Sequence, residues 1–185
     1  MRVRLNVFRE DGSLLLPAGN KPLFIIETSS LQEQNITPIR LKIYYNEQKF
    51  PGSLSNLKTN NYLLNILSLQ YAKANGFDDA LILNSRGNCC ETSSSNIFMI
   101  QKKIIYTPAL SEGCVAGTKR RELLETLPTL GFEIRESSIS PAMLFEMDEV
   151  FLSNAIRNIC PIDKIDQNLF QCKTVLNIIS SLNKS

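Results

Sequence analysis

The stretch Asn56–Asn65, NLKTNNYLLN, sets one lysine, Lys58, in front of an apolar run. Asn60 or Asn61 can cap a helix at this point through its side-chain oxygen. The sequence therefore predicts a helix that begins directly after Lys58. Its apolar face has the spacing of an amphipathic helix and consists of Tyr62, Leu63, Ile66, Leu67 and Leu69.

The expected position of Lys58 is unusual for a cation. The positive end of a helix dipole disfavours another positive charge, and burial would disfavour it further, so both effects favour the neutral amine. A neutral amine is the form that condenses with aldehydes and ketones. The alternative is an ordinary surface lysine, because lysine side chains are rarely buried.

Length and charge narrow the classes of protein. A chain of 185 residues suits one domain with a substantial core, so we expect a single domain over 1–185, with a β-rich segment at 1–50 and the main core at 51–185. The 20 basic and 18 acidic residues are balanced, which argues against a nucleic-acid partner. No run approaches the length of a membrane span, so no membrane partner is expected.

The cysteine and histidine content narrows the chemistry. The five cysteines are scattered and odd in number, which favours a reducing, cytoplasmic setting over a disulfide framework. The chain contains no histidine, which excludes a Ser-His-Asp or Cys-His centre built within it. No metal site is expected, and any general acid or base must be Lys, Glu, Asp, Tyr or Cys.

Short apolar or alternating runs predict strands along the chain. They lie at Val3–Phe8, Leu14–Leu16, Leu23–Glu27, Leu41–Tyr45, Ala80–Leu83, Asn96–Ile100, Ile104–Tyr106, Phe132–Glu136 and Glu149–Ser153. We expect Ala80–Leu83 and Asn96–Ile100 to form a hairpin across the turn at 85–88. Residues 154–161 are expected to form a loop.

Three further helices are predicted by their end signals. Pro128 ends the helix expected at Thr118–Leu127, and Pro141 marks the first turn of a short helix after Ser140. A last helix is expected at Gln171–Leu182. Helices alternate with strands in the second half, which indicates a mixed α/β fold.

Four segments hold most of the polar residues that no strand or helix explains. They are LKTNNYL (57–63), ETSSSNIF (91–98) followed by IIYTP (104–108), GCVAGTKRREL (113–123) and DEVFLSNAIRNICPI (148–162). In this order they resemble the class IV aminotransferases, the fold-type IV pyridoxal-phosphate enzymes, over almost the whole chain. That family includes branched-chain and D-amino-acid aminotransferases and 4-amino-4-deoxychorismate lyase. The resemblance implies the family's large domain, a mixed β-sheet or pseudo-barrel flanked by helices, with pyridoxal 5′-phosphate as cofactor.

The resemblance implies two chemical roles. Lys58 lies where the family's lysine binds the cofactor covalently and moves the substrate's α-proton. Glu91 lies where a carboxylate pairs with the pyridine nitrogen and keeps that nitrogen protonated. The alternative for Glu91 is a solvated residue on a hairpin strand, because glutamate is usually exposed.

The resemblance also implies a phosphate site. Gly117 opens a helix whose first N–H groups, on Thr118 and Lys119, suit a phosphate through their donors and the helix dipole. The family often has threonine at the position of Lys119, and the alternative is a simple turn with a solvated face at 119–121. The remaining residues of the implied site, with the second phosphate-contacting turn, are Asn96, Asn154, Ala155 and Ile156.

The chain begins at a strand that resembles the middle of family members. The family's N-terminal domain, which normally supplies an arginine to the phosphate and one wall of the substrate pocket, is therefore expected to be absent or supplied by a separate chain. The resemblance also implies a homodimer and a small-molecule substrate, either an amino acid or aminodeoxychorismate.

Three functions remain open. The pair Asn154-Ala155 is closer to the lyase branch and slightly favours elimination of pyruvate from aminodeoxychorismate to give 4-aminobenzoate. Branched-chain or D-amino-acid transamination is the enzymatic alternative, although aminotransferases commonly carry Gly-Thr or Ser-Thr at this turn. The non-enzymatic alternative is a truncated, inactive domain or an interaction module.

Overall fold

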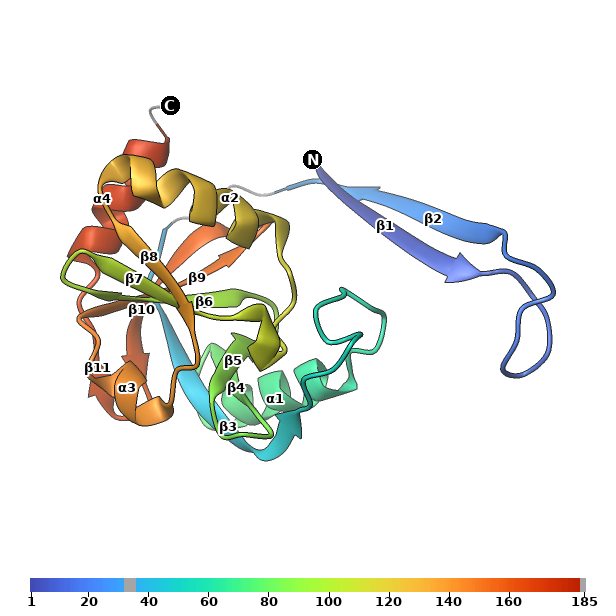
Figure 1. Ribbon diagram of the computed structural model, residues 1–185, viewed down its shortest axis with the longest axis horizontal. Coiled ribbons are helices and arrows are strands. Elements are labelled where there is room, and N and C mark those ends of the chain that lie inside the picture. Colours follow the sequence, from blue (N-terminus) through green and yellow to red (C-terminus); the bar gives the residue numbers. More distant parts are fainter. Residues whose placement is uncertain (32–35, 184–185) are drawn as a thin grey trace. The chain divides into compact units, whose positions relative to one another are not determined.

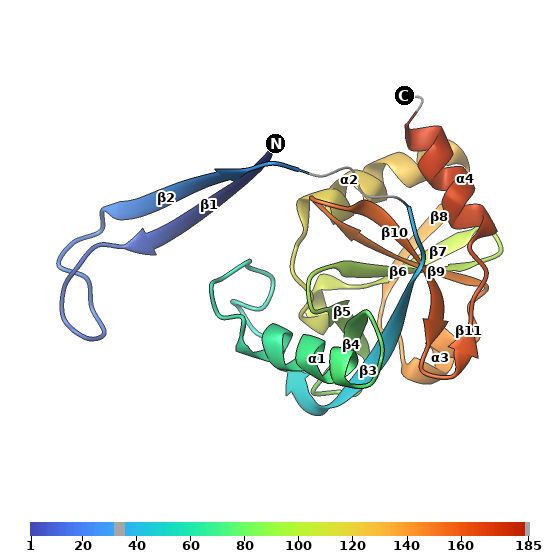
Figure 2. The same ribbon diagram turned by 180° about the vertical axis from the view of Figure 1, so that it is seen from behind.

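The computed structural model describes residues 1–31 and 36–183 (Figures 1 and 2). Its contacts divide the chain into two compact units, Met1–Asn35 and Ile36–Ser185. The expectation of one domain over 1–185, with a core from residue 51, stays a prediction. Within the described ranges, no helix is both long and apolar enough to cross a bilayer.

The first unit is an antiparallel hairpin of β1 (Arg2–Arg9) and β2 (Pro22–Ser29), in register from Arg2 opposite Ser29 to Arg9 opposite Pro22. Leu14–Leu16 do not form a strand, so the prediction of a strand at these residues is wrong. The Arg9 guanidinium donates to the carbonyls of Leu14 and Leu15, and Ser13 N–H donates to Leu16 O at 2.8 Å. These bonds close the segment into a loop rather than leaving its backbone free to pair.

The second unit is built on a curled mixed sheet (Figure 1). Over the part of the chain that the structure describes, it has nine strands, eight of which follow the order β5-β4-β3-β10-β9-β6-β7-β8, while β11 pairs with β10. The strands are β3 Ile39–Lys49, β4 Asp79–Asn84, β5 Cys89–Thr92, β6 Asn96–Gln101, β7 Ile104–Pro108, β8 Glu133–Ser137, β9 Glu149–Asn154, β10 Asn158–Ile165 and β11 Asn168–Leu169.

Helices flank this sheet, which confirms the predicted fold class. α2 and α4 pack on one face, where Leu123 and Val175 join a cluster with the stacked rings of Phe98 and Phe151. The other face encloses a second cluster, to which α3 contributes Leu144. The helices are α1 Leu63–Ala74, α2 Thr118–Thr126, α3 Pro141–Phe145 and α4 Lys173–Leu182, with short 3-10 turns at Leu110–Glu112 and Leu127–Leu130.

The expected hairpin between Ala80–Leu83 and Asn96–Ile100 is wrong. β4 pairs instead with the short strand β5, and β6 pairs with β7 and β9. The sequence of β5, CCET, contains no β-branched run that would have marked it as a strand. Its four residues are nevertheless fully buried, and this places Glu91 inside the protein rather than on a turn.

The loop expected at 154–161 is also wrong beyond residue 157, because β10 begins at Asn158. Pro161 lies inside this strand, although proline has no N–H group to donate to a strand ladder. In the structure Pro161 pairs with Phe151 of β9, and the pairing of β10 with β3 starts only at Ile162. Pro161 therefore precedes the pairing with β3, and its missing N–H group removes no hydrogen bond between β10 and β3.

Candidate functional site

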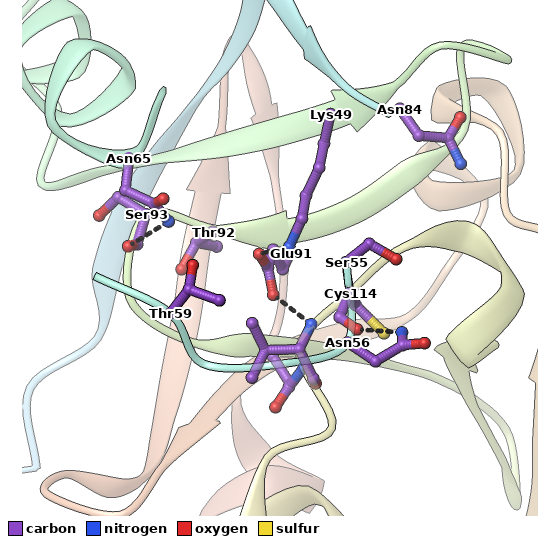
Figure 3. A network of polar contacts seen from close by, with 12 residues as sticks. Lys49, Ser55, Asn56, Thr59, Asn65, Asn84, Glu91, Thr92, Ser93 and Cys114 are labelled. Atoms are coloured by element: carbon purple, nitrogen blue, oxygen red, sulfur yellow. Dashed lines mark hydrogen bonds and ion pairs between the residues drawn. The ribbon is translucent and has the colours of Figure 1, made fainter. Parts of the chain in front are cut away.

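Glu91 lies on β5 and is 4% exposed. The Lys49 ammonium pairs with its Oε1 atom, and Val115 N–H donates to Oε2 at 2.7 Å (Figure 3). Both carboxylate oxygens are thus held, one by a charge from the end of β3 and one by the backbone of the segment before α2. The solvated alternative for Glu91 is wrong.

The Asn96 side chain connects β6 to the same segment. Asn96 Nδ2 donates to Val115 O at 2.8 Å, and a Cβ added at Gly117 would overlap Asn96 Oδ1. Gly117 has ordinary extended dihedrals, φ −65° and ψ 141°. Position 117 therefore requires glycine because the Asn96 amide approaches the backbone closely, and not because of a left-handed conformation.

The N-terminus of α2 follows directly. Gly117 occupies the N-cap position without a side-chain cap, and Arg121 N–H is the first to bond back, to Gly117 O at 3.0 Å. The N–H groups of Thr118 and Lys119 have no intrahelical acceptor, as at any helix start. They add two donors and the positive end of a dipole beside Asn96.

The alternative of a solvated face at 119–121 is wrong for its middle residue. Arg120 is 4% exposed and donates to Pro108 O at 2.9 Å and to Glu136 at 2.6 Å. Lys119 forms an ion pair with Glu122 at 2.6 Å along the helix. The Arg120 contacts join the first turn of α2 to β7 and β8, so this helix N-terminus is held against the sheet.

Asn56 joins the Lys58 loop to this segment. The side-chain amide of Asn56 donates to Cys114 O at 2.7 Å (Figure 3) and to Leu110 O at 2.8 Å. The backbone carbonyl of Asn56 accepts Ala116 N–H at 2.9 Å. These bonds bring the chain just before Lys58 against the residues that lead into α2. The loop is thus fixed two residues ahead of the lysine.

Lys58 itself is exposed, and its ammonium lies 5.4 Å from the centre of the Tyr62 ring. α1 begins five residues later, at Leu63, with Tyr62 at the N-cap position and no side-chain cap. The predicted cap by Asn60 or Asn61 is therefore wrong. The dipole of α1 does not disfavour the charge on Lys58 either, because a helix dipole acts only within about one turn of the terminus.

The Asn154 turn is joined to the loop after Glu91. Asn154 Nδ2 donates to Ser95 Oγ at 2.9 Å, while its Oδ1 accepts the N–H groups of Ile156 at 2.9 Å and Arg157 at 2.7 Å. The asparagine thus closes its own turn and takes up the Ile156 N–H. Ala155 lies exposed at the tip of that turn.

Buried thiols near Glu91 are poor nucleophiles. Burial raises the pKa of Cys114 to about 11, and burial also raises the pKa of the neighbouring Cys90. Both side chains are therefore protonated thiols near neutral pH. Neither cysteine is therefore a candidate nucleophile in this part of the site.

Hydrogen bonds thus connect four segments that are far apart in the sequence, around Asn56, Glu91, Gly117 and Asn154. Sequence reasoning found all four but missed Lys49 and Val115. Lys49 carried no signal beyond its position in a polar stretch after a strand. Val115 contributes only backbone groups, which no side-chain pattern reveals.

The chain belongs to the class IV aminotransferases, because the model of that family matches residues 1–165. Enzymes of this family use pyridoxal phosphate. The branched-chain-amino-acid aminotransferase of Pseudomonas aeruginosa is 32% identical over 115 residues, which cover 62% of this chain and 37% of that protein. The aminodeoxychorismate lyase of Vibrio harveyi is 30% identical over 112 residues, which cover 60% and 41%. The chain thus spans about two fifths of the length of these curated relatives.

Solved structures of two enzymes share the fold of this chain. The structure of a putative 4-amino-4-deoxychorismate lyase from Legionella pneumophila superposes on this chain with a TM-score of 0.78 at 28% identity. The match covers 91% of this chain and 66% of the lyase chain. An aminotransferase from Brucella abortus, bound to pyridoxal phosphate, superposes with a TM-score of 0.81 over 99% of this chain and 68% of that one. At 21% identity this second likeness shows the fold alone.

Proposed function

We propose that this chain holds pyridoxal 5′-phosphate as the cofactor-binding part of a class IV enzyme. The observation that carries the proposal is one backbone segment, 115–117, which joins a buried carboxylate to an uncapped helix N-terminus through Val115 and Gly117. The buried carboxylate can pair with a pyridine nitrogen, and the helix N-terminus suits a phosphate.

The residues present fit the cofactor at both ends. Glu91 is buried and ionically paired, and its carboxylate can accept a further donor, the ring nitrogen. The absence of a side chain at Gly117 leaves room for the Asn96 amide beside the start of α2. Thr118 and Lys119 would hold the phosphate through their N–H groups. The turn formed by Asn154, Ala155 and Ile156 would be the second phosphate-contacting turn, and the Ile156 N–H would contact the phosphate only after Asn154 Oδ1 releases it.

Lys58 is assigned the covalent and proton-moving role. Its exposed amine would bind the cofactor's aldehyde carbon and, once released, move the α-proton of the substrate. When bound, pyridoxal phosphate supplies the electron sink for the negative charge that develops at that α-carbon. The negative charge of Glu91 would favour the protonated form of the ring nitrogen.

Among the family's reactions, we favour the lyase reaction, elimination of pyruvate from aminodeoxychorismate to give 4-aminobenzoate. Asn154 supports it, because the asparagine takes two N–H groups of its own turn, an arrangement that a Gly-Thr pair could not make. The likeness to the lyases of Vibrio harveyi and Legionella pneumophila also supports it. Branched-chain transamination is the second candidate, supported by the Pseudomonas aeruginosa relative.

The partners follow from the same reading. The substrate is a small molecule, either aminodeoxychorismate or an amino acid, and the active form is a homodimer in the cytoplasm. An inert domain or interaction module is the remaining alternative.

Two measurements test the proposal. Pyridoxal phosphate added to the purified chain should give a visible absorption band that Lys58→Ala abolishes and Lys73→Ala leaves intact. Turnover of aminodeoxychorismate to 4-aminobenzoate, without transamination of leucine and 2-oxoglutarate, supports the lyase. The opposite pattern supports the transaminase, and absence of any band supports the inert module.

A further inference from the structure

A second lysine, Lys49, holds the carboxylate that the proposed function assigns to the ring nitrogen. Lys49 is the last residue of β3, and its ammonium pairs with Glu91 Oε1 while Val115 N–H holds Oε2 (Figure 3). The side chains of Lys49 and Glu91 are 18% and 6% exposed. The carboxylate is therefore fixed at both oxygens by donors from different parts of the chain.

The pair has an electrostatic reason. A charged carboxylate with so little exposure is costly unless an opposite charge and hydrogen bonds compensate it. Lys49 supplies the charge, and Val115 supplies a second donor. Two donors at the end of a flexible side chain also remove most of its rotational freedom. The entropy cost of ordering Glu91 is thereby met before a ligand arrives.

These contacts leave Glu91 able to bind a third donor. An ionised carboxylate has about four lone-pair sites, of which Lys49 and Val115 occupy two. A protonated pyridine nitrogen offers one N–H donor with a positive charge. Glu91 can therefore receive that donor without releasing Lys49.

We infer that Lys49 is a positioning residue, which fixes the Glu91 carboxylate so that the protein selects a ring that contains a nitrogen. The inference rests on the proposed function, because it assigns Lys49 to the same site. Lys49 acts through Glu91, so its effect vanishes when Glu91 has lost its charge.

The test compares two ligands that differ only at the ring nitrogen. Dissociation constants are measured on the purified chain for pyridoxal 5′-phosphate and for its 1-deaza analogue, in which a C–H group replaces that nitrogen. We expect the wild type to prefer pyridoxal phosphate, and Lys49→Met and Glu91→Gln each to reduce this preference about tenfold. In the double variant the preference should fall no further than in Glu91→Gln.

Two variants control for structure and charge. Lys42 lies on the same strand and forms an ion pair with Asp166 at 2.9 Å, with side chains 23% and 19% exposed. Lys42→Met removes a comparable ion pair outside the site and should leave the preference unchanged. Lys49→Arg keeps the positive charge and should retain most of the preference.

Each outcome decides the inference. An unchanged or larger preference in Lys49→Met overturns it and leaves the proposed function standing, as does a wild type that binds both compounds equally. A wild type that binds neither compound overturns the proposed function and the inference with it. If Lys49→Met does not fold, a preference kept in Lys49→Arg and lost in Lys49→Gln supports the inference, and equal preferences in those two variants overturn it.

Discussion

The Glu91 and Lys58 regions of the site are built in opposite ways. Glu91 sits on a fully buried strand, with both carboxylate oxygens held. Lys58 sits in the irregular stretch between β3 and α1, with an exposed side chain whose ammonium lies over the Tyr62 ring. In the proposed site, the sheet places the group that would only hold a charge, while a loop carries the group that would react.

The difference has a physical basis. A fixed charge is most effective when it is preorganised in a water-poor environment. An amine that binds an aldehyde and later moves a proton must change partners, and an exposed side chain loses little by doing so. The Asn56 amide joins the two regions, since it fixes the start of the Lys58 loop to the segment that holds Glu91.

Lys58→Ala should have the largest effect of any change in the site. Pyridoxal phosphate followed by borohydride should leave a reduced adduct on Lys58 in the wild type and none at position 58 in the variant. Peptide mapping locates the adduct. An adduct centred on Lys73, or spread over surface lysines, would place the reactive amine outside this loop.

Glu91→Gln should preserve cofactor attachment and slow proton removal. The substitution keeps the shape of the side chain but removes its charge, so the ring loses the partner that keeps its nitrogen protonated. We expect exchange of the substrate's α-proton into deuterated water to slow roughly a hundredfold, about 3 kcal/mol. Exchange at the parent rate would reduce Glu91 to a structural residue of β5.

Acid should weaken the segment that joins the two regions, through Glu112. Burial alone would raise the pKa of this glutamate, but side-chain donors outweigh it and lower the pKa from 4.5 to about 2. The donors are Ser138, Asn88, Asn84 and Arg86. The carboxylate is therefore bound more tightly when ionised, and its contribution is complete above about pH 4.5 and lost as pH falls towards 2.

The expected loss is about 3 kcal/mol of unfolding free energy, because the pKa of Glu112 falls from 4.5 to about 2 on folding. Urea unfolding at several pH values measures it, and Glu112→Gln is the comparison, because it has no charge to titrate. Equal pH slopes for the two proteins between pH 4.5 and 2 would show that Glu112 does not carry this stability.

Thr118→Pro should weaken the phosphate end of the site. Proline is compatible with the first helical position but removes one backbone donor. Affinity for pyridoxal phosphate should fall about tenfold, while the melting temperature of the free protein changes little. Thr118→Ala keeps the N–H group and is the matched control. Equal affinities of the two variants would locate the phosphate away from α2.

Asn56→Ala should have the smallest effect of the five changes, and the effect should be confined to the loop that contains Lys58. The change removes two hydrogen bonds, to Leu110 O and Cys114 O, and should cost about 1 kcal/mol of stability. Limited proteolysis should cut between residues 51 and 62 faster than in the wild type. Asn60→Ala, an exposed change in the same loop, should not alter the rate. Equal cleavage in both variants would mean that Asn56 does not hold the loop.

The sequence predicted the four segments of the site because side chains define them. The class of fold followed from alternating helices and strands and from the resemblance of those segments. Most strands were found for the same reason, since runs such as ALIL and NIFMI are covered by apolar clusters on both faces. Ser140 and Pro141 also marked the start of a helix correctly.

The failures came from long-range pairing. The strand β5 is too short and too polar at Glu91 to be recognised before its partner β4 is known. Pro161 looked like a loop residue until its position between β9 and β3 was known. Lys49 lies 42 residues from Glu91, so no local pattern could connect them.

The backbone of Val115 has an evolutionary consequence. Its N–H group binds Glu91 and its carbonyl binds Asn96, so a single residue sets the spacing between the two ends of the site. Neither bond uses the side chain. These two bonds by themselves exclude only proline at position 115, because proline lacks the N–H group. A family of such proteins could vary freely here, and a comparison of their sequences would pass over one of the residues that define the site.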